Sequence, residues 1–166
     1  MAKKNSKLNF ITLGLAFVAL ISAFLFALLP MVKTVLKLGS SETVTNYGGF
    51  SMIFGGTVIE GKVVSVTAEF NTLAFIAFLL VVVGAILMVV FEFVPSLKNN
   101  KIVALIPAAV VFLGGILMFC VKGSAATALG LEDVKDDVLL AAGPIVGGIF
   151  AVLAGGAGVV LPVLKK

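Results

Sequence analysis

The side chains that most often perform catalysis are scarce in this sequence. It contains no His and a single cysteine, Cys120, so Ser-His and Cys-His pairs and His-rich metal sites are excluded. A Ser-Lys or carboxylate pair would need its members brought together, and nothing in the residue order does this for Ser22 or the acidic residues. Ser22 is expected to bond to its own helix backbone and Cys120 to be a buried apolar side chain. We therefore expect no enzymatic activity, no metal and no cofactor.

Glu92 differs from the other acidic residues because it alone lies inside a long apolar stretch, in the segment FEFVP. A carboxylate within a membrane is a candidate for an ion or proton site. Glu92 is also close to the end of its stretch, where a side chain reaches the headgroup region or a nearby lysine, Lys98 or Lys101. Both interpretations, an interfacial carboxylate and an ion or proton site, stay open.

A second candidate site is a row of small residues in the last apolar stretch. Gly143, Gly147, Ala151 and Gly155 are spaced four apart, so on a helix they form one ridge. Small residues let another helix backbone approach closely. We interpret this glycine ridge as a helix-contact surface, which faces the chain's own bundle, another copy or protein, or a pore.

The composition indicates the solvent that the chain requires. Of its 166 residues, 61% are hydrophobic and 12% charged, and its mean hydropathy is +1.26, whereas soluble domains are about a quarter charged. Four apolar stretches, at about 8–32, 70–94, 102–121 and 138–163, are each long enough to cross roughly 30 Å of hydrocarbon. Because they lack the alternation of barrel strands, they predict helices. The fold class is an all-α membrane protein, one four-helix bundle over residues 1–166, with the lipid bilayer as partner.

The lysines predict the orientation, because cytoplasmic ends and loops carry an excess of positive residues. Seven lysines lie in the two ends and the second loop, which contain no acidic residue: Lys3, Lys4, Lys7, Lys98, Lys101, Lys165 and Lys166. The opposite side carries five lysines with seven acidic residues. Both termini are therefore predicted to face the cytoplasm. The lysines beside apolar stretches are topology signals, so we expect no nucleic-acid binding, and the first stretch is too long for a signal peptide and is interpreted as a retained anchor.

The long first loop, at about 33–69, mixes β-branched and aromatic residues with glycine pairs. This pattern predicts a small antiparallel sheet on the extracellular surface, with the strands ETVTNY, FSMIF, TVI and KVVSVTAEF; a mobile loop is the alternative. The third loop, KGSAATALGLEDVKDD, is predicted to hold a short helix and a solvated acidic cluster. Pro30 and Pro95 are expected to stop helices.

This layout resembles the claudin and peripheral-myelin type of four-span protein, with its strand-rich first outer loop and a tight inner turn, here PSLKNNK. The resemblance is one of topology. The family's first-loop signature needs Trp and a Cys pair, and this loop has neither, so no functional residue carries over. The use of Lys without Arg also resembles small uncharacterised four-span proteins of low-GC bacteria, which implies a bacterial cell membrane.

These patterns favour a non-enzymatic integral membrane protein that acts through contacts, as a structural, scaffolding or accessory subunit. Its glycine ridge and outer loop would bind another copy or other membrane proteins. The alternative is an oligomeric channel or transport component, because one bundle this apolar has no polar pathway of its own. An immunity or stress-type membrane protein remains a further hypothesis.

Overall fold

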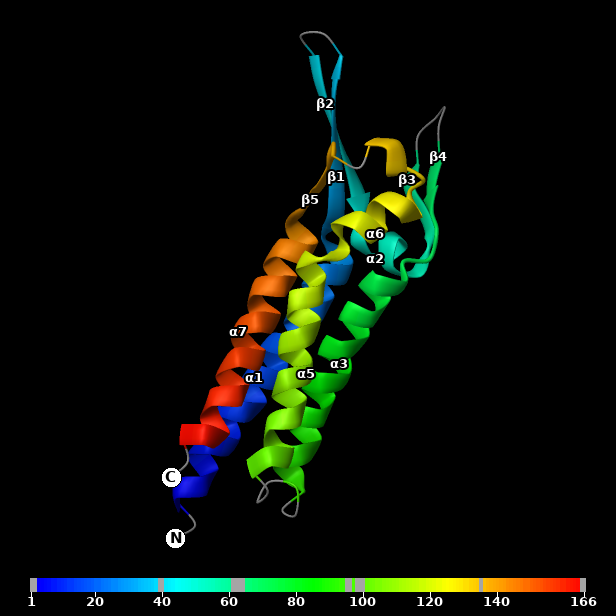
Figure 1. Cartoon of the computed structure of the whole chain (residues 1–166). Helices are drawn as coiled ribbons and strands as arrows, with labels where there is room; N and C mark the ends of the chain where they lie inside the picture. Colours follow the sequence, from blue (N-terminus) through cyan, green and yellow to red (C-terminus); the bar gives the residue numbers. More distant parts are fainter. Residues whose placement is uncertain are drawn as a thin grey trace.

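The computed structural model describes residues 3–38, 41–60, 65–94, 97, 101–134 and 136–164. Its four long helices are α1 (Lys3–Leu28), α3 (Thr72–Phe93), α5 (Lys101–Phe119) and α7 (Ala142–Leu164). Each contains an apolar segment long enough to cross a membrane. They pack lengthwise into an elongated bundle (Figure 1). The predicted four-helix membrane fold is confirmed.

The four helices form a closed ring in which α1 and α5 each pack against both α3 and α7. Consecutive spans run in opposite directions, so every neighbouring pair in the ring is antiparallel (Figure 1). α1 begins and α7 ends at the same end of the bundle, far from the β-strands. The interior is filled by small side chains without solvent exposure, among them Ala16, Ala19, Ala77, Val81, Ala85, Val111 and Ala151.

The contact between α3 and α5 is reciprocal. A Cβ built on Gly84 would lie 2.7 Å from a side-chain atom of Val111, and a Cβ on Gly114 would lie 2.7 Å from one of Val81. The side chain of Val111, three residues before Gly114, thus packs against Gly84. The side chain of Val81, three residues before Gly84, packs against Gly114. The pentapeptides that begin at these glycines, GAILM and GGILM, nearly repeat, so two similar sequences pack antiparallel against each other.

The connections between α1 and α3 and between α5 and α7 form two antiparallel sheets at one end of the bundle. The first has the order β2-β1-β5, built from β1 (Pro30–Leu38), β2 (Ser41–Gly48) and β5 (Val138–Leu140). The second pairs β3 (Gly56–Glu60) with β4 (Ser65–Ala68). The predicted small sheet is confirmed, and β5 adds to it a strand from the third loop. β4 lies within the fourth predicted strand, whose first three residues are outside the described part of the chain, as is the turn PSLKNNK between α3 and α5 except for Leu97 and Lys101.

Two of the predicted apolar stretches include residues that form strands in place of helix. α1 ends at Leu28 and the chain continues from Pro30 as β1, so Pro30 stops the helix as predicted. At the other boundary, the apolar residues of β5 precede α7. Met31, Val32 and Val138 are fully buried. Their side chains are apolar because they pack in the interior as parts of strands, and they do not belong to a membrane-spanning helix. The prediction for Pro95 falls outside the described residues.

One predicted strand is wrong, because FSMIF lies in the short helix α2 (Gly49–Phe54). Met52 and Ile53 are fully buried on one side of it. A Cβ on Gly49 would lie 2.5 Å from the carbonyl oxygen of Leu29, so only glycine allows α2 to seat against the end of α1. The short helix predicted in the third loop is confirmed as α6 (Val121–Ala128), which the 3₁₀ turn η1 (Glu132–Val134) follows.

Candidate functional site

A group of polar side chains lies where α6 meets the start of α3, at the sheet end of the bundle. The backbone N–H of Glu69, just before α3, donates to the carbonyl oxygen of Ala128 at 2.8 Å. The chain then turns away at Gly130, whose φ of +66° is a left-handed conformation that glycine adopts without strain. This link holds α6 beside the first turn of α3 and leaves a cleft between them.

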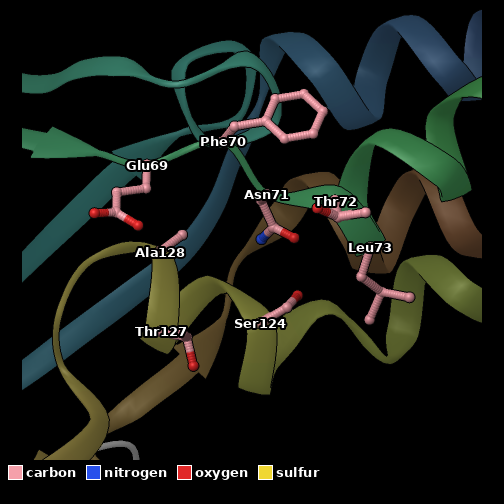
Figure 2. A pocket seen from close by; sticks show the side chains of 8 residues that line it. All are labelled: Glu69, Phe70, Asn71, Thr72, Leu73, Ser124, Thr127 and Ala128. Carbon is pink, nitrogen blue, oxygen red and sulfur yellow. The ribbon is translucent and has the colours of Figure 1, made fainter.

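Figure 2 shows this cleft, which has a volume of about 360 Å³. One wall comes from the segment that leads into α3 and the other from α6. Its lining residues are Glu69, Phe70, Asn71, Thr72, Leu73, Ser124, Thr127 and Ala128. The cleft therefore offers amide, hydroxyl and carboxylate groups beside apolar side chains.

Asn71 is the buried polar residue of this cleft, with 2% of its surface exposed. Its Oδ1 accepts a hydrogen bond of 3.1 Å from the backbone N–H of Ala74, which caps the first turn of α3. Its amide nitrogen, Nδ2, is buried without a hydrogen-bond partner. In Figure 2 the Asn71 amide extends toward α6. An unsatisfied buried donor costs free energy, so this nitrogen is the point where a hydrogen-bond acceptor would be most stabilising.

A second cleft of about 510 Å³ adjoins the first and shares Glu69, Thr127 and Ala128 with it. It adds the exposed carboxylates of Glu132 and Asp133. Among the residues that the structure describes, no group of acidic residues and cysteine is placed to hold a metal ion. The Ser124 hydroxyl donates to the carbonyl oxygen of Val121 at 3.0 Å, within its own helix. The two clefts thus present groups for recognition by hydrogen bonding and charge.

The glycine ridge predicted from the sequence lies inside the bundle. A Cβ on Gly143 would lie 3.1 Å from the carbonyl oxygen of Phe26, and one on Gly147 would lie 3.0 Å from that of Ser22. At the other end of the ridge, a Cβ on Gly155 would lie 2.5 Å from the backbone nitrogen of Phe112. Ala151 lies between, fully buried and facing Gly115 of α5. The ridge therefore faces α1 over its first half and α5 over its second half.

Because its own chain covers this ridge, a neighbouring protein has no access to it in the folded bundle. The spacing of four places these residues on one face of the helix, and it contained no information on which helix would cover that face. A contact with another protein must use a different surface.

Glu92 lies in the last turn of α3, half-buried, at the opposite end of the bundle from the clefts. Its proposed partner Lys98 is outside the described residues, as is the side chain of Lys101. Neither the clefts nor the ridge includes Glu92. Its assignment as an interfacial or ion-binding carboxylate stays a prediction.

Two expectations about single residues are wrong. The Ser22 hydroxyl donates across the bundle to the carbonyl oxygen of Gly147 at 2.8 Å, and does not bond within its own helix. The absence of a side chain at Gly147 brings the two backbones close enough for this bond. Cys120 is exposed, because α5 ends at Phe119 and the chain bends there into α6.

Sequence reasoning did not find Asn71 or the clefts. One signal was present, because Asn71 lies at the start of a long apolar stretch, and Asn is among the preferred residues at a helix N-cap. The clefts themselves depend on the docking of α6, which no local pattern contains.

Searches against protein-family models and against curated proteins find no match to this chain. The likeness to the claudin type is therefore limited to four long apolar helices with an antiparallel sheet between the first two.

Proposed function

We propose that this protein is a non-enzymatic, membrane-anchored contact protein, a structural or accessory subunit whose β1–β2 hairpin binds another protein. The observation that carries the proposal is the reach of this hairpin. β1 and β2 pair from Pro30 and Gly48 to Leu38 and Ser41. β5 pairs with β1 only from Val32 to Thr34. Figure 1 shows the hairpin extending beyond all other elements of the sheet end.

The outer half of the hairpin has open edges. β2 is an edge strand of its sheet. The N–H of Val35 donates to the carbonyl oxygen of Asp137 at 3.4 Å, and past Val35 the far edge of β1 pairs with no described strand. Unpaired strand edges are templates for another strand, and recognition by strand addition uses them. An isolated two-stranded hairpin is only marginally stable in water. A partner strand on either edge would therefore stabilise the hairpin while it binds.

The bundle supports an anchoring role better than a transport role. Three polar side chains are buried among the described residues: Ser22, Thr34 and Asn71. Of these, only Ser22 lies within a span, and its hydroxyl is bonded to Gly147. An ion crossing the membrane needs polar groups along its path. No observation on a single copy favours the alternative of a channel or transport component.

We also propose that both termini face the cytoplasm of a bacterial cell, with the hairpin outside. The start of α1, with Lys3, Lys4 and Lys7, lies at the end of the bundle opposite the sheets. The acidic residues Glu69, Glu132, Asp133, Asp136 and Asp137 lie at the sheet end, between or beside the strands. Excess lysine at the first end supports this orientation. Lys98, Lys165 and Lys166, which contribute to the same argument, lie outside the described residues.

The contact is tested by photo-crosslinking in native membranes. A photoreactive amino acid replaces Val44, which is exposed on β2, and in a matched control it replaces Leu153, which is exposed on α7. Both positions carry exposed aliphatic side chains, so neither substitution disturbs the core. We expect the Val44 position to crosslink to protein and the Leu153 position to lipid. Crosslinks to protein at Leu153 and none at Val44 would place the contact on the bundle and refute a hairpin interface.

A further inference from the structure

The short helix α2 separates its side chains by chemistry. Met52 and Ile53 are fully buried against the protein, whereas Phe50 is 60% exposed and Phe54 is 39% exposed. Exposed aromatic rings are unfavourable in water, because burying a phenylalanine side chain removes a large apolar area from water. α2 thus has an outward apolar face that no described part of the chain covers.

The exposed rings of α2 are continuous with rings on α3. The centroids of Phe50 and Phe54 lie 4.7 Å apart, and that of Phe54 lies 5.9 Å from those of both Phe75 and Phe78. Phe70, which is 52% exposed, lies 5.3 Å from Phe75. We call these five rings the phenylalanine surface.

The phenylalanine surface lies at the depth of the span ends. Phe75 and Phe78 belong to the first two turns of the second span, which begins at Thr72. Helical side chains lean toward the N-terminus, so the Phe78 ring lies near the first turn of α3. On the other side, the N–H of Gly49 donates to the carbonyl oxygen of Leu29 at 3.1 Å, directly after α1 ends. α2 is therefore level with the last turn of α1 and the first turn of α3.

The exposed side of α3 continues this apolar surface along the bundle. The exposed side chains along α3 include Ile76, Leu79, Val83, Ile86 and Val90, which face lipid if the span crosses a membrane. The strands around α2 are more polar on their surface than α2 and α3, because their exposed residues include Asn46, Thr57 and Thr67. The sequence from Thr43 to Ile59 contains no charged residue, so no charge on this stretch would oppose entry of α2 into a membrane.

We propose that α2 is embedded in the bilayer leaflet at the sheet end, with the phenylalanine surface against the lipid acyl chains. The outer loop thus leaves the membrane as the β1–β2 hairpin, returns to it at α2, and leaves again as β3 and β4. Amphipathic helices bind membrane surfaces in this way, with the apolar face in the acyl boundary. The lipid contact of α2 also fixes the base of the hairpin at the membrane surface.

The absence of Trp from the chain makes a direct test possible. Single-tryptophan variants Phe50→Trp, Val83→Trp and Asn46→Trp are reconstituted in phosphatidylcholine vesicles whose acyl chains carry bromine near the glycerol or near the bilayer centre. We expect Phe50→Trp to emit at short wavelength and to be quenched most by the shallow bromines. Val83→Trp is the control for lipid at greater depth and is quenched most by the deep bromines. Asn46→Trp is the control for water, with long-wavelength emission and no quenching.

Long-wavelength emission from Phe50→Trp without quenching would overturn the proposal, because α2 would then lie in water. Short-wavelength emission without quenching would also overturn it, because a second copy or another protein would then cover the ring. Phe70→Trp carries the same expectation through a residue outside α2, so a Phe50→Trp variant that fails to fold leaves the proposal testable. Far-UV circular dichroism of each variant establishes that the helices are formed.

Discussion

At the scale of single residues, the helix contacts of this protein depend on missing side chains. A Cβ at Gly155 would meet the backbone nitrogen and Cα of Phe112 at 2.5 and 2.7 Å. Backbone atoms within a helix cannot move aside without shifting the whole helix. At the adjacent Gly156, a Cβ would meet only the ring of Phe112, at 3.8 Å, which is ordinary van der Waals contact. The two neighbours therefore differ in what they tolerate.

This difference predicts opposite effects of the same substitution. Gly155→Ala should lower the free energy of unfolding by about 1–3 kcal/mol, the range for overpacking a tight core. Gly156→Ala should leave it unchanged or raise it by up to about 1 kcal/mol, because alanine has the higher helix propensity. Unfolding titrations in mixed micelles with increasing SDS measure both variants. Equal losses at the two positions would show that α5 and α7 are not packed as closely as described.

Spacing along the sequence identified the ridge residues, but it did not identify their partners. A repeat of four places residues on one helix face whatever covers that face. Gly143 and Gly147 meet α1 while Gly155 meets α5, because the order of the helices around the ring determines the neighbours. The Ser22 bond to Gly147 was missed for the same reason. Spacing along one sequence predicts local structure, but it does not predict contacts between residues that lie far apart in the chain.

At the scale of elements, the start of α3 depends on its capping residue, Asn71. The Oδ1 of Asn71 satisfies the N–H of Ala74, while the Nδ2 of the same side chain is buried without a partner. The cap stabilises the helix start and the unsatisfied donor opposes it. The two contributions can be separated by substitution.

Asn71→Ala removes the cap, and we expect it to lower the free energy of unfolding by about 1 kcal/mol. Asn71→Ser retains an oxygen acceptor and removes the unpartnered amide nitrogen, so it should match or exceed the stability of the native chain. Chemical unfolding followed by circular dichroism gives both values. A serine variant as unstable as the alanine variant would mean that the amide nitrogen has a stabilising partner.

The sequence predicts best those elements whose residue pattern is compatible with only one kind of secondary structure. Unbroken apolar stretches of this length leave helices as the only structure that satisfies the backbone in lipid. Short apolar segments are ambiguous, because a strand buried on both faces and a helix end have the same composition. The sequence therefore predicts a helix at Val138–Leu140, which forms the strand β5 in the structure. It predicts a strand at FSMIF, which lies in the helix α2. In α2, burial of Met52 and Ile53 outweighs β-propensity.

At the scale of the whole molecule, the chain divides into an apolar bundle and a polar end. The bundle is a ring of antiparallel helices with an interior rich in alanine, valine and glycine, into which the larger Phe26 and Met118 also pack. The sheets, the two clefts and the acidic residues of the third loop all lie at one end. This division supports the proposed function, in which the bundle is a membrane anchor and the sheet end makes the contacts.

The central claim is that the chain crosses the membrane four times and displays the hairpin outside the cell. Labelling of engineered cysteines in intact cells with a membrane-impermeant maleimide tests it most directly. The background is Cys120→Ser, because Cys120 is exposed. One variant adds Asn46→Cys on β2 and the other adds Lys4→Cys at the start of α1. Labelling of Asn46→Cys before lysis, and of Lys4→Cys only after lysis, is the predicted result. The reverse pattern would contradict the orientation, and labelling of both before lysis would contradict a membrane crossing by α1.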